Sequence, residues 1–233
     1  FHYLGTYQTE EEAAKAPNDP NAQGRKKHAG DAIFEDVNND GQLDSKDMIF
    51  MGYVRPDKVG GIINTLKYKG LTVRIVMDWA MGHVIDNGFK GQIMGSSRNN
   101  NNAIKEAMTN SWQSANDGSK YPKYTVQSDY DYQYRNHMRW DNQIGSSASG
   151  STNNSLYFSK GDYLAFREVS LSYMLPLSWI RKMKLSAVEV FAGAYNIGYI
   201  KKYDGMFPEI YTGVDYGIYP RPRQYNMGVK INF

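Results

Sequence analysis

The residues with the clearest chemistry stand between Asp36 and Asp47. Aspartate, asparagine and aspartate occupy positions one, three and five of a loop, and a glycine at position six permits its sharp turn. The seventh residue would offer its backbone carbonyl, and the ninth would act through a water molecule. Hard oxygen donors at this spacing suit Ca²⁺. The predicted ligands are Asp36, Asn38, Asp40, Gln42, Asp44 and Asp47.

The last position of this loop departs from the commonest pattern, which has glutamate there. Asp47 reaches less far, as is typical of the dockerin-type loops of extracellular proteins. The alternative is a turn rich in Asp and Asn that holds no metal. The sequence therefore predicts a structural calcium site and leaves the metal-free turn as its competitor.

No other residues suggest a catalytic or redox centre. The four histidines (His2, His28, His83 and His137) lie far apart, and the chain contains no cysteine. Sequence signatures of serine hydrolases, P-loop enzymes and dinucleotide-binding proteins are missing as well. We therefore predict that the chain is not an enzyme.

Aromatic side chains are the remaining candidates for binding. A run between Tyr121 and Trp140 interleaves them with arginine and histidine, and the last long loop adds Tyr211, Tyr216 and Tyr219. They could stack on sugars or pack on a partner protein, or the loops could simply pack on one another. The candidates in the first run are Tyr124, Tyr130, Tyr132, Tyr134 and Trp140.

Composition narrows the class of protein. Of the 233 residues, 41% are hydrophobic and 22% charged, which excludes wholesale disorder. The net charge of +3 is spread along the chain, so we expect no nucleic-acid partner. No window approaches the roughly 18 uninterrupted apolar residues of a membrane-spanning helix, but the strands of a β-barrel alternate and would not show such a run.

Alternation of apolar and polar residues predicts antiparallel strands. In the last of them Tyr225, Met227, Val229, Ile231 and Phe233 share one face. The two-residue link Lys69-Gly70 predicts a hairpin, and residues 102–112 predict a helix. A basic turn over 176–184 is predicted to be a solvated connection rather than a lipid patch. The six predicted strands are 1–7, 59–68, 71–85, 163–174, 186–197 and 224–233.

The connections between these strands alternate between long and short. The long ones cover residues 8–58, 86–162 and 198–223, and the short ones lie at Lys69-Gly70 and at 176–184. Transmembrane β-barrels have this pattern, with long extracellular loops and short periplasmic turns. A secreted β-sandwich binding module with a calcium loop is the alternative.

Short motifs in order along nearly the whole chain resemble the C-terminal third of the SusC/RagA family of TonB-dependent outer-membrane transporters. The final strand is similar to the assembly signal of outer-membrane proteins, which would be read from Tyr225, Met227, Val229, Ile231 and Phe233. The other matching stretches are 30–41, 68–70, 110–112, 121–122, 161–164 with Arg167, 171–176, 195–196, 204–205, 208–209 and 219–223.

This resemblance implies that residues 1–233 supply about the last six strands of a 22-stranded transmembrane β-barrel in the bacterial outer membrane. It also implies a plug domain and a TonB contact, both outside this chain, and a SusD-like surface lipoprotein as partner. The expected function is TonB-dependent uptake of oligosaccharides or peptides, with residues 8–58, 86–162 and 198–223 as extracellular loops. Six strands cannot close around a lumen, so we expect this chain to complete a larger barrel.

Overall fold

The structure is a computed structural model, and it describes residues 1–97, 104–126, 131, 135 and 154–233. The chain divides into two units. Unit 1 comprises Phe1–Gly52, Val84–Ser159 and Ile210–Gly217, and unit 2 comprises Tyr53–His83, Lys160–Glu209 and Ile218–Phe233. In the described part of the chain, no helix is both long enough and apolar enough to cross a membrane.

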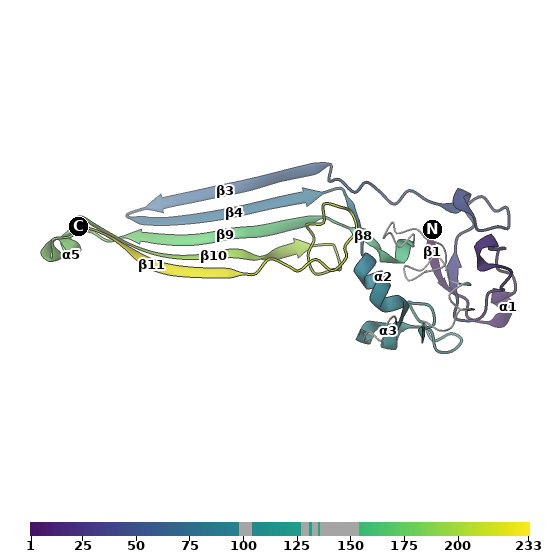
Figure 1. Cartoon of the computed structure of the whole chain (residues 1–233). Helices are drawn as coiled ribbons and strands as arrows, with labels where there is room; N and C mark the ends of the chain where they lie inside the picture. The colour runs from purple at the N-terminus through teal and green to yellow at the C-terminus, as the bar shows by residue number, and fades with distance from the viewer. Residues whose placement is uncertain (98–103, 127–130, 132–134, 136–153) are drawn as a thin grey trace. The chain divides into compact units, whose positions relative to one another are not determined.

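Five long antiparallel strands form the main sheet, which lies in unit 2. They are β3 (Lys58–Tyr68), β4 (Leu71–Met81), β9 (Tyr163–Met174), β10 (Ala187–Lys201) and β11 (Gln224–Asn232). Their order in space is β11-β10-β9-β4-β3, so β3 and β11 are the two open edges (Figure 1). Five of the six predicted strands are thus confirmed as one antiparallel sheet.

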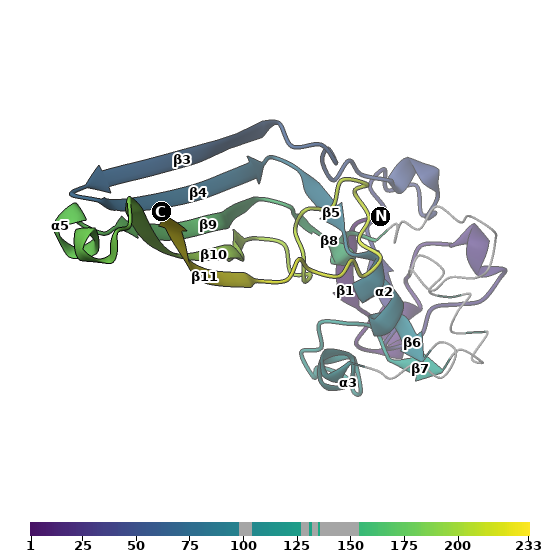
Figure 2. The same ribbon diagram turned by 60° about the vertical axis from the view of Figure 1, so that its left-hand side comes forward.

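Both short connections of the sheet lie at the same end of it. Lys69 and Gly70 have φ angles of 45° and 84°, the conformation of a tight hairpin turn whose twist matches that of the strands. The link from β9 to β10 is a helical turn made of α5 (Leu177–Ile180) and η4 (Arg181–Met183). Figure 2 shows α5 at the end of the sheet where β3 turns into β4.

The strand register separates an apolar face of the sheet from a polar one. Val73, Leu171, Ala192 and Met227 follow one another across β4, β9, β10 and β11. One position along, the same four strands carry Arg74, Ser170, Gly193 and Asn226 on the opposite face. Leu171 is 47% exposed and Met227 88% exposed, so the apolar face is not covered like a protein core.

Two irregularities in the pairing, one on each side of β9, interrupt this alternation partway along β4, β9 and β10. Glu168 pairs with Val76 and Phe166 pairs with Met77, which leaves Arg167 as an extra residue on β9. On the other side β10 also slips, because Tyr195 pairs with Glu168 whereas Gly198 pairs with Phe166. Such β-bulges redirect a side chain, and here the redirected residue is an arginine.

Unit 1 is built from short elements and loops. Two of its clusters of buried side chains are centred on Phe34 with Leu43 and on Tyr121 with Tyr157. The short strands are β1 (Tyr3–Thr6), β2 (Ala32–Phe34), β5 (Val84–Asp86), β6 (Ser96–Ser97), β7 (Thr125–Val126) and β8 (Phe158–Lys160), paired as β1-β2, β5-β8 and β6-β7. The helical turns are α1 (Glu10–Ala13), η1 (Pro20–Ala22), η2 (Ser45–Asp47), α2 (Gly88–Gly95), α3 (Lys105–Asn110) and η3 (Ser155–Tyr157).

Three of the predicted elements were wrong in place or extent. The strand expected at residues 1–7 is β1, which pairs with β2 because Phe1 and Tyr3 pack edge-on against Phe34. The strand expected at 71–85 ends at Met81, because Gly82 has a φ of 83°. Within the described part of residues 102–112 the helix is only α3, because the backbone is extended at Ser111.

Candidate functional site

The loop predicted to bind calcium closes on itself through its own side chains. The Asp36 carboxylate accepts hydrogen bonds from the backbone N–H of Asp40 at 3.2 Å and of Gly41 at 2.8 Å. Asn38 Oδ1 accepts from the same Asp40 N–H at 2.9 Å, and Gly41 has a φ of 79°. The side chains of positions one, three and five therefore belong to one tight turn, as the spacing predicts.

Leu43 fixes this loop to the rest of unit 1, and Asp47 holds the two ends of the loop together. Leu43 is buried beside Phe34, and its N–H donates to the carbonyl of Asn18 at 2.8 Å. Asp47 is buried as well, and its carboxylate accepts from the N–H of Val37 at 3.0 Å and of Asp44 at 2.8 Å. The outer part of the loop is thus exposed, while Leu43 anchors it and Asp47 joins its two ends.

A lysine compensates the acidic side chains of the loop. Lys46 Nζ lies 3.3 Å from Asp40 Oδ2 and 3.5 Å from Asp44 Oδ2. Hydrogen bonds from the Asn38 amide and the Gln42 N–H hold the pKa of Asp40 below its usual value. No three His, Asp or Glu side chains of the described residues are grouped so that they could hold a metal ion. The oxygen donors of the loop suit Ca²⁺ chemically, and the ion would have to displace the Lys46 ammonium group.

The strongest electrostatic cluster of the sheet surrounds Arg167. Its guanidinium group binds both carboxylate oxygens of Asp78 on β4, at 2.6 and 2.8 Å. It also donates to Glu209 Oε1 at 2.5 Å and to the Tyr199 hydroxyl at 3.2 Å. Asp78 lies on the polar face, so the bulge turns Arg167 toward this face.

Glu209 links this cluster to the long segment that follows β10. Its side chain is only 1% exposed, and it accepts a hydrogen bond from the Tyr199 hydroxyl at 2.6 Å. Arg221 adds a second guanidinium group at 3.4 Å. Burial alone would raise the pKa of Glu209, but the hydrogen bonds from Tyr199 and Arg167 outweigh it and lower this pKa. The cluster therefore fastens residues near Glu209 to the polar face of the strands.

A hollow of about 400 Å³ lies further along the same polar face. Arg74 at its wall lies 3.3 Å from Glu168, and the Ser170 hydroxyl donates to the same carboxylate at 2.7 Å. This surface suits water, a polar cargo or another polar part of the protein. Its lining residues are Thr65, Lys67, Thr72, Arg74, Ser170, Leu171, Ser172, Phe191, Ala192, Tyr195 and Asn226.

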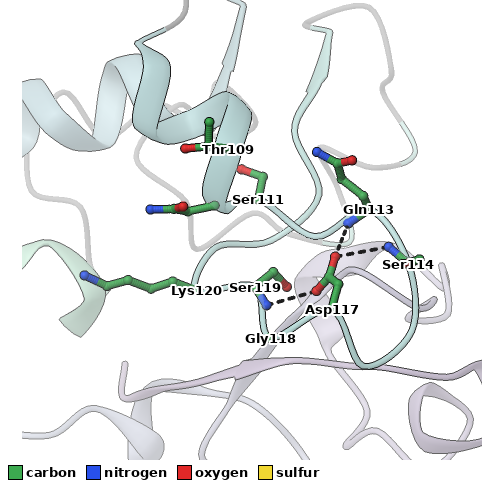
Figure 3. Close-up of a pocket in the computed structure, with 9 residues that line it drawn as sticks. Thr109, Ser111, Gln113, Ser114, Asp117, Gly118, Ser119 and Lys120 are labelled. Carbon is green, nitrogen blue, oxygen red and sulfur yellow. Dashed lines mark hydrogen bonds between the residues drawn. The ribbon is translucent and has the colours of Figure 1, made fainter.

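Unit 1 carries a second polar hollow, of about 530 Å³, around residues 109–120 (Figure 3). Asp117 shapes it, because its carboxylate accepts from the N–H groups of Gln113, Ser114 and Ser119 at 2.7, 3.1 and 2.9 Å. These bonds, with that of Gln113 the strongest, lower the pKa of Asp117 to about 2. The buried Ser111 hydroxyl has no hydrogen-bond partner among the described residues. No apolar side chain lines this hollow, so it suits only a strongly hydrated molecule.

The aromatic candidates are only partly described. Tyr124 packs against the cluster around Tyr121, whereas Tyr130, Tyr132, Tyr134 and Trp140 lie outside the described residues, as does His137. Tyr211, Tyr216 and Tyr219 are exposed. The proposed assembly residues share the apolar face, and all of them are exposed: Tyr225, Met227, Val229, Ile231 and Phe233.

The sequence prediction assigned no role to the residues of the Arg167 cluster. Arg167, Glu209 and Arg221 stood in stretches that carry the family resemblance, while Asp78 and Tyr199 were not singled out as site residues. One signal was present in the sequence, because Asp78 and Arg167 are charged residues of opposite sign inside two predicted strands. Two such residues that are half-buried in strands are expected to pair.

Comparison with known proteins gives matches over the whole chain. No family model matches it. It is 24% identical to TonB-dependent receptor P3 of Formosa agariphila over 245 residues, which is 100% of this chain and 22% of the relative. TonB-dependent receptor P26 of the same organism is 24% identical over 99% of this chain and 22% of the relative. The chain thus spans about a fifth of the length of these relatives.

Solved structures share the fold. A structure of the RagAB peptide transporter matches with a TM-score of 0.66 and 18% identity, over 100% of this chain and 22% of that chain. The RagAB peptide importer in the open-open state matches with a TM-score of 0.64 and 19% identity, over the same shares. The relatives are receptors and a transporter rather than enzymes, in agreement with the prediction that the chain is not catalytic.

Proposed function

We propose that this chain, a C-terminal part of a SusC/RagA-like TonB-dependent receptor, forms part of the wall of an outer-membrane nutrient importer. The observation that carries the proposal is the five-stranded sheet with one exposed apolar face and one polar face. In a membrane barrel the apolar face would contact lipid and the polar face would line the interior. The whole-chain similarity to TonB-dependent receptors favours this function over a secreted β-sandwich module.

In the complete protein, we propose, a plug domain closes the barrel and TonB opens it through the N-terminal part of the receptor. Residues 8–58, 86–162 and 198–223 would be extracellular loops that meet a SusD-like surface lipoprotein. The RagAB structures are described as those of a peptide transporter, which supports peptide cargo over oligosaccharide. The chain itself would bind and guide the cargo without chemical change.

This function is tested with the complete receptor in its own cells. Deleting the receptor should abolish most uptake of a labelled peptide mixture while leaving the uptake of small, porin-permeant sugars unchanged. Restoring the receptor should restore uptake only when TonB is present. If the deletion strain takes up peptides normally but loses the uptake of an oligosaccharide, the cargo is an oligosaccharide rather than a peptide. A receptor missing from the outer-membrane fraction would contradict the proposed location.

We also propose that the loop from Asp36 to Asp47 holds a structural Ca²⁺ ion. The ligands would be the side chains of Asp36, Asn38, Asp40 and Asp47, the Gln42 carbonyl, and Asp44 through water. The closed turn of positions one, three and five supports this assignment. Bound Ca²⁺ would stiffen an extracellular loop where cargo or the lipoprotein docks.

Calcium binding is expected to be weak and to depend on two carboxylates. By analogy with extracellular modules, calorimetry on the complete receptor should give a Kd of about 10⁻⁴–10⁻³ M. The double variant Asp36→Ala/Asp40→Ala should show no binding, whereas Asp117→Asn, which removes a carboxylate outside the loop, should bind like the parent. Undiminished binding by the double variant, or none by the parent at millimolar Ca²⁺, would leave the metal-free turn as the correct interpretation.

A further inference from the structure

The turn between β9 and β10 exposes large apolar side chains. Leu177 is 61% exposed, Trp179 64% and Met183 59%, whereas Ile180 is buried and anchors the turn. Exposed apolar side chains occur singly on most protein surfaces, but here three of them fall within seven residues. The sequence predicts this turn to be a solvated connection, but three large apolar side chains so close together are costly to expose to water.

The same turn carries three cations without partners. Arg181, Lys182 and Lys184 are exposed, and none of them forms an ion pair with any residue that the structure describes. No acidic residue stands between Met174 and Val188. The turn therefore has three positive charges that are available to an external anion.

The neighbouring hairpin at the same end of the sheet also has an exposed ring and a cation. The N–H of Met174 donates to the carbonyl of Gly70 at 2.9 Å, which places the two turns side by side (Figure 1). Lys69 Nζ lies 5.2 Å from the centre of the exposed Tyr68 ring. We call the two segments 68–70 and 177–184 the short-turn end of the sheet.

We propose that the short-turn end binds anionic phospholipid headgroups of the periplasmic leaflet. This inference rests on the proposed function, because it requires the sheet to stand in a membrane. Trp179 and Tyr68 would lie at the level of the headgroups, where aromatic rings are favoured, and Leu177 would point toward the acyl chains. Arg181, Lys182 and Lys184 would pair with the phosphates.

Two features favour lipid over a protein partner: the positive charge of the turn, and the apolar face of the sheet that leads up to it. The apolar face runs through the neighbouring pair of Tyr173 and Val190, only a few residues from the turn. The proposed lipid-facing surface thus leads directly into the cluster of cations. An anionic phospholipid is complementary to this surface, because its apolar acyl chains lie next to a negatively charged headgroup. Basic residues close to anionic headgroups are attracted to them.

The test is a titration of the complete, detergent-purified receptor with phosphatidylglycerol or phosphatidylcholine, with bound lipid counted by native mass spectrometry. The parent should prefer phosphatidylglycerol. The triple variant Arg181→Gln/Lys182→Gln/Lys184→Gln should lose this preference, with an affinity loss of up to roughly a hundredfold. The matched control Arg55→Gln/Lys58→Gln/Lys160→Gln removes three exposed cations from the other end of the sheet and should bind like the parent.

Two results would overturn this inference. One is equal binding of both lipids by the parent, and the other is a loss of preference in the control triple variant as large as that in the test variant. Fractionation of the same cells separates this failure from that of the proposed function. A receptor that is present in the outer membrane but shows no preference for phosphatidylglycerol contradicts only the lipid site, whereas a receptor absent from the outer membrane contradicts the location itself.

Discussion

Arginine at Val229 is expected to lower the amount of mature receptor in the outer membrane several-fold. Val229 is exposed on the apolar face of β11, directly opposite Val190 on β10. If this face contacts lipid, a cation on it costs about 2–4 kcal/mol at the middle of the bilayer and less toward the headgroups, and Val229 lies between the two. The measurement is the heat-modifiable, membrane-inserted receptor in fractionated cells.

The matched control places the same residue on the opposite face of the same strand. Asn226 belongs to the polar face, so Asn226→Arg should leave the receptor level within about twofold of the parent, because lumen positions tolerate charge. Equal levels of Val229→Arg and parent would contradict the assignment of the apolar face to lipid. Equal loss in both variants would point to a general folding defect of β11.

Replacing Arg167 by methionine is expected to destabilise the attachment of the segment near Glu209 to the sheet by about 3 kcal/mol. Removing one partner of a buried ion pair leaves an uncompensated charge, which costs about 3–5 kcal/mol. Glu209 is almost fully buried but keeps Tyr199 and Arg221, so we expect the lower end of this range. Deuterium uptake around Glu209 should rise, and the thermal unfolding temperature of the receptor should fall.

The control for this variant is Arg74→Met on the same polar face. Arg74 is more exposed and lies 3.3 Å from Glu168, so its loss should cost less than about 1 kcal/mol. Adding Glu209→Gln to Arg167→Met should recover part of the loss, because the buried charge disappears. If Arg167→Met behaves like Arg74→Met, the cluster does not fasten the segment near Glu209.

The sheet was predictable from sequence where apolar and polar residues alternate simply along a strand. The alternation in 71–81 and in 169–173, with the tight turn at Lys69-Gly70, specified three neighbouring strands. The first strand was misplaced because its partner depends on aromatic packing with Phe34, a contact between residues distant in sequence. Local periodicity does not report such contacts.

The two candidate sites also differ in how far they could be predicted from sequence. The loop from Asp36 to Asp47 could be recognised because its residues are consecutive and their spacing carries the chemistry. The Arg167 cluster draws its residues from three strands and a loop, and only the register brings Asp78 opposite the bulge. A single sequence indicates that such charges need partners, but not which partners they find.

The bulge at Arg167 also changes which residues of β9 face the polar side of the sheet. Residues 168–174 and residues 163–166 alternate in opposite phase, so Glu168 and Ala165 face the same side although three positions separate them. Deleting Phe166 while Arg167 stays bulged would turn the first part of the strand inside out, sending Tyr163 toward the apolar side and Leu164 toward the polar one. Deleting Arg167 itself would remove the bulge and leave both residues on their present faces. Homologous chains that are one residue shorter at this point are therefore expected to lack the residue equivalent to Arg167 rather than one of its neighbours.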